Sequence, residues 1–207
     1  MSGILGVLVG TASAAAFSPV TRTYTTGISA TETIPALASS VVIEVFGACG
    51  AGGAYSTLDS IVYYGGGGGG SGGYSKKTAS VVGSGGLTMT YTVGAGGATT
   101  AGKGGAGQGS LVVSGTFSLT TITTFGGDGG AQTFGGGAGG TEGSSGSGGD
   151  TNVGGNVGTN GSIATNGVGG AGRTGTNGDG LAGGDGAFYP SPAQVDGGTG
   201  KIIFSYT

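Results

Sequence analysis

Short runs in which apolar and polar residues alternate occur within the first 124 residues and again at the C-terminal end. In SSVVIEVFG, Val41, Ile43 and Val45 fall on one side of an extended chain and Glu44 falls on the other. A period of two residues is typical of a strand with one buried face. We therefore predict a strand here, with Glu44 at the surface of the sheet.

Other segments with this alternation are rich in β-branched and aromatic residues, which favour pleated sheets. They are TRTYTT, GYSKKTASV, LTMTYTVG, SLVVSG, TFSLTTITTF and, at the C-terminal end, GTGKIIFSYT. We expect the last of these to return to the sheet that the N-terminal strands begin. Beyond the N-terminal tail, no segment has the 3.6-residue apolar period of a helix.

Residues 125–187 follow a different pattern, with 27 glycines and few large side chains. Glycine recurs every third residue at Gly155, Gly158 and Gly161. An extended helix with three residues per turn brings such positions onto one side. Without a Cβ there, neighbouring backbones can approach closely and make N–H···O and Cα–H···O contacts. We predict short polyglycine-II-like helices that fold back on one another.

The predicted fold is all-β: a small antiparallel β-sandwich with a glycine-rich stack of polyglycine-II-like helices and turns, and almost no α-helix. The same patterns of alternation and glycine spacing divide the chain into four parts. They are an apolar N-terminal assembly segment (1–17), a β-rich domain interrupted by glycines (18–124), a polyglycine-II-like region (125–196) and a closing strand (197–207).

The glycine content raises disorder as an alternative, because the chain has 58 glycines and 4 prolines among 207 residues. Disorder of the charged type combines high net charge with few apolar residues. Here the formal net charge is −3 and the mean hydropathy is slightly positive. The glycine runs are therefore interpreted as building material of the fold and not as flexible linkers.

The polar residues favour a binding or structural protein over an enzyme. Histidine is absent and Cys49 is the single cysteine, which excludes a Ser-His-Asp triad, a zinc site of His and Cys, and an internal disulfide. We expect Cys49 to be a small buried apolar group. No catalytic, metal or cofactor-binding residue is assigned, and no cofactor is expected. The only basic doublet is Lys76-Lys77, too little for a nucleic-acid partner.

The N-terminal stretch MSGILGVLVGTASAAAF is uncharged and apolar, and the first cation is Arg22. It lacks the basic n-region of a secretory signal and is too short and glycine-broken for membrane insertion. We expect it to make an assembly contact with a neighbouring subunit in a homo-oligomer. The alternative is that it packs on its own domain.

Two glycine-containing motifs occur by chance in such a chain. Gly97–Lys103 fits G-x-x-x-x-G-K, but Gly104 replaces the required Ser/Thr and no helix follows. NGDGLAGGDG resembles one calcium-binding nonapeptide, a motif that works only in tandem copies. The first is therefore rejected as a nucleotide-binding loop, and Asp179 and Asp185 of the second are interpreted as turn residues.

Two clusters of aromatic residues interrupt the glycine runs. Aromatic residues on anchored loops are common in recognition surfaces. The alternative is that these rings pin the glycine layers together. The candidate receptor-binding residues are Tyr55, Tyr63, Tyr64, Phe188 and Tyr189.

In order along the chain stand VVIEVFGACGAGG, GGGGGGSGGYSKKTASV, LTMTYTVGAGG and GTGKIIFSYT. With these motifs the chain resembles the glycine-rich domain proteins encoded by tailed bacteriophages, over Tyr24–Ser114 and Gly197–Thr207. Phe46 stands where Trp is common in that family and Cys49 where Gly is usual. The resemblance implies a location in the virion, at the tail or the fibre tip. It also implies that the N-terminal segment contacts other virion subunits.

The resemblance thus favours a phage tail-fibre or tail-tip adhesin that binds a receptor on the host surface. A purely structural virion component, such as a decoration or tail-assembly subunit, is the first alternative. An ice-binding protein with a flat threonine face is the second, suggested by the run TTITT.

Overall fold

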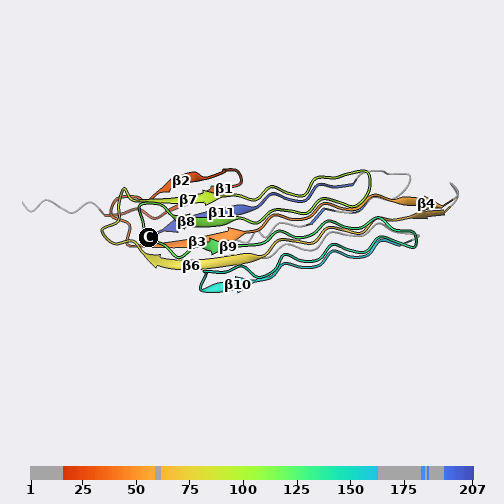
Figure 1. Ribbon diagram of the computed structural model, residues 1–207. Helices are drawn as coiled ribbons and strands as arrows, with labels where there is room; N and C mark the ends of the chain where they lie inside the picture. The colour runs from red at the N-terminus through yellow and green to blue at the C-terminus, as the bar shows by residue number, and fades with distance from the viewer. Residues whose placement is uncertain (1–15, 59–61, 163–182, 185, 187–193) are drawn as a thin grey trace, which may run out of the picture.

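A computed structural model of the 207-residue chain shows strands and extended glycine-rich segments (Figure 1). The residues described are 16–58, 62–162, 183–184, 186 and 194–207. Over these residues the chain contains no α-helix, and no helix there is long and apolar enough to cross a membrane. The predicted all-β class is confirmed. The molecule is elongated, with a β-sandwich at one end and glycine-rich segments running away from it.

The larger sheet has five antiparallel strands in the order β1-β11-β3-β6-β10. They are β1 (Val20–Tyr24), β11 (Lys201–Tyr206), β3 (Ser40–Phe46), β6 (Tyr74–Ser80) and β10 (Thr151–Val153). The C-terminal strand β11 pairs with β1 on one side and β3 on the other. The expected return of this strand to the N-terminal sheet is confirmed.

The second sheet has four antiparallel strands in the order β2-β7-β8-β9. They are β2 (Ala30–Thr33), β7 (Thr88–Thr92), β8 (Leu111–Ser114) and β9 (Ile122–Thr123). A separate two-stranded hairpin, β4 (Ser56–Leu58) with β5 (Val62–Tyr64), lies at the far end of the molecule (Figure 1).

The long strand predicted from TFSLTTITTF is wrong in its extent, because only β9 forms within it. The residues before β9 form a loop that returns to the preceding strands. The backbone N–H of Phe117 donates to the carbonyl of Thr88, and that of Leu119 donates to Oγ of Ser114. Phe117 and Leu119 alternate with polar residues because both pack against the core, although they lie in a loop and not in a strand.

The hydrophobic core lies between the two sheets. Val41, Ile43 and Val45 are fully buried there, as their alternation predicts. The facing sheet contributes Met89, Tyr91, Val112 and Ile122, and β11 contributes Ile202, Phe204 and Tyr206.

The expectation that Glu44 lies at a sheet surface is wrong. Its side chain does lie on the face opposite Ile43, but it is fully buried. Phe46, Tyr74 and Ile203 form a second apolar cluster on this face. The Tyr74 hydroxyl donates a 2.7 Å hydrogen bond to a carboxylate oxygen of Glu44. Burial is the main cause that raises the pKa of Tyr74 above its ordinary value, and the hydrogen bond to Glu44 adds to it.

One long hairpin runs from the sandwich to the far end and back. In the sandwich Ser40 pairs with Ser80 and Phe46 with Tyr74, and beyond it the N–H of Gly53 donates to the carbonyl of Gly67. The pairing of β4 with β5 keeps the same register. Strand, glycine-rich helix and strand are therefore successive parts of one chain pair.

Residues 47–55, the outgoing arm of this hairpin, lie at the centre of the glycine-rich stack. Within the described residues they bond through backbone groups to six neighbouring segments. Every third N–H group donates to the same neighbour, as three residues per turn requires. The bonds to the returning arm join Gly47 to Gly73, Gly50 to Gly70 and Gly53 to Gly67, with N···O distances of 2.8–2.9 Å. The other five neighbours are residue 97, residues 102–108, residues 127–130, residue 184 and residues 195–198.

The three-residue glycine spacing has the predicted consequence at residues 155–161. There the N–H groups of Gly155, Gly158 and Gly161 donate to one neighbouring segment, residues 137–143. A Cβ on any of these three glycines would overlap the carbonyl oxygen of residue 71, 68 or 65, respectively. The polyglycine-II-like stack is confirmed, and it also includes glycine runs upstream of residue 125.

Candidate binding surface at the distal end

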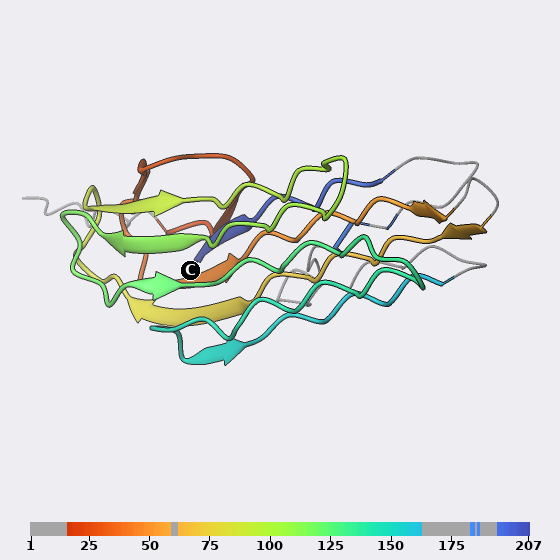
Figure 2. The same ribbon diagram turned by 45° about the vertical axis from the view of Figure 1, so that its right-hand side comes forward.

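The tip of the long hairpin forms the end of the molecule farthest from the sandwich, which we call the distal end (Figures 1 and 2). Three of the predicted site residues lie there. Tyr55 directly precedes β4, and Tyr63 and Tyr64 belong to β5. The two glycine-rich arms of the hairpin stay paired in one register, so these residues lie at its tip, far from the sandwich.

An aromatic residue that we did not assign to a site from the sequence, Phe134, completes this surface. Its side chain is 68% exposed. The half-buried ring of Tyr64 lies 6.4 Å from the Phe134 ring, centroid to centroid, with the ring planes at 83°. Such edge-to-face contact suits the charge distribution of aromatic rings. The signal was present in the sequence, since Phe134 also interrupts a glycine run.

The turn that carries Phe134 is held by polar contacts. The Thr133 hydroxyl donates to the carbonyl of Gly136 at 2.7 Å, and the Gln132 side-chain amide donates to the carbonyl of Tyr55 at 2.7 Å. Gly135 and Gly136 have φ angles of 101° and 107°, a conformation that side chains rarely adopt. Glycine is therefore required at this turn.

Phe188 and Tyr189, the second predicted aromatic pair, lie outside the described residues, as does the side chain of Tyr63. Most of the N-terminal assembly segment also lies outside them; within it only Ala16 and Phe17 are described.

Five described residues at the distal end have uncharged side chains: Tyr55, Tyr64, Gln132, Thr133 and Phe134. Among them there is no acid–base pair and no activated nucleophile. Exposed ring surface beside amide and hydroxyl groups is suited to recognition. Together these described groups offer ring faces and neutral hydrogen-bonding groups to a ligand.

The sequence profile of a family described as a glycine-rich domain matches residues 23–207, which cover the described glycine-rich stack and both sheets except the first three residues of β1. The chain belongs to this glycine-rich domain family. A search of curated proteins found no match.

Within this glycine-rich domain, Cys49 belongs to the central segment of the stack and is fully buried, as predicted. Burial raises the pKa of its thiol. A buried neutral thiol is unreactive, so Cys49 acts here as a small packing residue.

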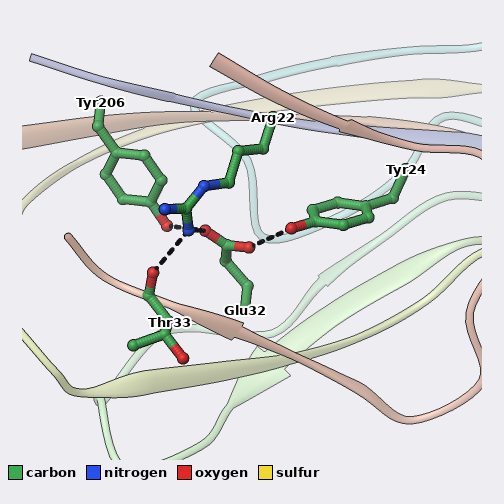
Figure 3. Close-up of polar contacts among 5 residues, drawn as sticks. All are labelled: Arg22, Tyr24, Glu32, Thr33 and Tyr206. Atoms are coloured by element: carbon green, nitrogen blue, oxygen red, sulfur yellow. Dashed lines mark hydrogen bonds and ion pairs between the residues drawn. The ribbon is translucent and has the colours of Figure 1, made fainter. Parts of the chain in front are cut away.

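The glycine-rich domain also contains a buried carboxylate that joins its two sheets (Figure 3). Glu32 on β2 is 1% exposed and accepts three hydrogen bonds from the opposite sheet. The donors are Arg22 Nη1 at 2.7 Å, the Tyr24 hydroxyl at 2.7 Å and the Tyr206 hydroxyl at 2.9 Å. The same Arg22 nitrogen also donates to the carbonyl of Thr33 at 3.0 Å.

These contacts shift the pKa values of the donors. Burial, followed by the bond to Glu32, raises the pKa of Tyr24 to about 12. Burial and the Glu32 charge raise the pKa of Tyr206 still further. Burial opposes the charge on Arg22, but the bond to Glu32 and its attraction keep the pKa of Arg22 raised. The cluster thus connects the two sheets through one buried carboxylate.

The raised pKa of Tyr24 predicts sensitivity to alkali. Its contribution to stability is complete below the ordinary phenol pKa of 10.0 and is lost as the pH rises through about 12. The free energy of unfolding should therefore fall across this interval, and less steeply in Tyr24→Phe than in the unmodified protein. Urea denaturation at a series of pH values measures both slopes. Equal slopes would show that Tyr24 titrates alike in the folded and unfolded chains.

Proposed function

We propose that this protein is a non-enzymatic surface protein of a tailed-phage virion, a tail-fibre or tail-tip adhesin that binds a receptor on the host cell through its distal end. The observation that carries the proposal is the exposed Phe134 ring, which packs against Tyr64 at the tip of the glycine-rich stack.

The stack supports this proposal because its backbone is hydrogen-bonded to several neighbours and it offers few side chains along its length. Its central segment, residues 47–55, bonds through its backbone to neighbours on all sides. A surface of glycine backbone gives a partner little to distinguish, so selectivity would reside in the turns. Loops on a rigid scaffold are where binding residues concentrate.

The placement of the chain ends also supports it. Val20, at the start of β1, pairs with Tyr206, and the carbonyl of Thr207 accepts hydrogen bonds from the N–H groups of Ser39 and Ser40. Both ends of the described chain are therefore at the sandwich, opposite the distal end (Figure 1). Attachment through the sandwich would leave the aromatic surface free to meet a receptor.

The phage assignment is supported by the resemblance of the strand and glycine motifs to glycine-rich domain proteins of tailed phages. Membership of the glycine-rich domain family agrees with that resemblance at the level of the fold.

Removing the distal rings should abolish most of the binding. Phe134→Ala and Tyr64→Ala are each expected to weaken binding to host cells by at least about thirtyfold, the loss typical of a binding hot spot. Phe134→Ala should leave the melting temperature unchanged because the ring is mostly exposed. Cell-binding affinity and melting temperature are measured on the same purified variants.

Phe125→Ala is the matched control, since Phe125 is also exposed (51%) but follows β9, away from the distal end. It should bind like the unmodified protein. Unchanged binding by Phe134→Ala would refute the adhesin proposal and favour a decoration or tail-assembly subunit. Equal losses for all three variants would also refute it, because the effect would then be independent of position.

A further inference from the structure

A second apolar surface lies at the sandwich end, opposite the aromatic one. It consists of Leu37 on the loop between β2 and β3, and Val82 and Leu87 on the loop between β6 and β7. Their exposed fractions are 66%, 73% and 38%. We call these three residues the end patch. Single exposed apolar residues are ordinary, whereas a group on adjoining loops marks a contact surface.

The two loops are bonded to each other through their backbones. The Ile34 N–H donates to the carbonyl of Leu87, and the Gly86 N–H donates to the carbonyl of Ile34, both at 2.9 Å. The Val81 N–H donates to the carbonyl of Ser39 at 3.0 Å. The end patch is thus presented on a fixed backbone.

Leu37 has a φ of 67°, in the left-handed region that glycine favours. A bulky side chain is unfavourable in this conformation. The neighbouring loop uses glycine for its own left-handed positions, Gly83 and Gly86, with φ of 72° and 84°. Leu37 is also mostly exposed, so its side chain contributes little to its own core. A leucine at this position is explained if its side chain contacts another molecule.

An apolar segment joins the described chain at this same end. Phe17 packs against the core of the sandwich, and β1 begins soon after it, at Val20. Residues 1–15 precede it and carry no charge. Their large apolar residues are Met1, Ile4, Leu5, Val7, Leu8 and Val9.

We propose that the end patch of one copy receives residues 1–15 of a second copy, so that the protein forms a homo-oligomer through its sandwich end. Phe17 already packs, partly buried, against the core of its own subunit, and burial of the apolar residues before it requires a further apolar surface. Burial of both uncharged surfaces drives the association. Exchange of the segment between equivalent copies closes a symmetric assembly. The distal end stays free, and the inference does not depend on what that end binds.

The test compares oligomeric state across concentrations by size-exclusion chromatography with light scattering. The full chain is expected to associate. Leu37→Gly should weaken association by at least about tenfold, while the melting temperature of the dissociated subunit stays the same or rises, because glycine suits the backbone there. Val82→Ser should weaken association to a similar degree. Ile28→Ser is the matched control: Ile28 is 86% exposed but lies on the β1–β2 loop, at the opposite end of those strands. It should associate like the unmodified chain.

Deletion of residues 1–15 should weaken association as much as Leu37→Gly does. The double variant should associate no more weakly than either single variant, because both changes remove the same contact. A monomeric full chain at all concentrations would overturn the proposal. So would a deletion that matters while the end-patch variants do not, because the segment would then bind elsewhere. Patch variants that matter without any effect of the deletion would indicate a patch-to-patch contact and would overturn it as well.

Discussion

Replacing Gly69 with alanine is expected to destabilise the protein by at least about 3 kcal/mol, at the upper end of overpacking effects. Gly69 lies in the returning arm of the long hairpin, and a Cβ there would overlap the backbone carbonyl of Gly50 in the central segment. The Gly69 N–H also donates to the carbonyl of Gly184 at 2.8 Å. Neither neighbour can rotate away, since both are backbone. Chemical denaturation measures the change.

Gly102→Ala is the matched control. The nearest atom to a Cβ at residue 102 is the side-chain oxygen of Gln132, at 3.5 Å, which is an ordinary contact. This substitution should change the free energy of unfolding by less than about 0.5 kcal/mol. Equal effects of Gly69→Ala and Gly102→Ala would contradict close backbone packing as the reason for glycine in the stack.

Replacing Glu32 with alanine is expected to cost about 2–4 kcal/mol of stability. Removal of one partner of a buried ion pair is strongly destabilising because the other groups keep their desolvation penalty. Here the Tyr206 hydroxyl would remain buried without its carboxylate. Water reaches the Arg22 side chain, which is 38% exposed, and this limits the loss. Urea denaturation at neutral pH gives the difference.

Lys77→Ala provides the comparison, because the 3.0 Å ion pair of Lys77 with Asp150 lies at the surface. Its loss should cost under about 1 kcal/mol. Glu32→Ala and Tyr206→Phe should be less than additive, since they remove the same hydrogen bond. Additive effects, or a Glu32→Ala loss no larger than that of Lys77→Ala, would show that the cluster does not act as a unit.

Part of the candidate binding surface could be predicted from the sequence. Tyr55 and Tyr64 stand out as aromatic residues between glycine runs, and both lie at the distal end. Phe134 carries the same local signal, but its contact with Tyr64 joins segments far apart in the chain. Periodicity within one segment carries no information on which distant segment lies beside it.

Whether a polar side chain is buried also could not be predicted from one segment alone. The alternation places Glu44 on the face opposite Val41, Ile43 and Val45, and it does lie there. Whether that face meets water depends on the cluster of Phe46, Tyr74 and Ile203. These residues come from three strands, so no single strand could reveal the outcome.

The sequence by itself determined the longer strands, such as β3, β7 and β11, and the glycine-rich helix at residues 155–161. Periods of two and three residues act between near neighbours in the chain and can therefore be recognised without the tertiary structure. The sequence also determined that glycine is required at Gly155, Gly158 and Gly161, where one side of the helix must lack side chains. Only the tertiary structure decided that residues 47–55 lie at the centre of the stack and that Glu32 is buried between the sheets. A helix with three residues per turn directs its N–H groups to three sides and its carbonyl groups to neighbours as well. Only contacts between distant segments decide which neighbour lies on each side.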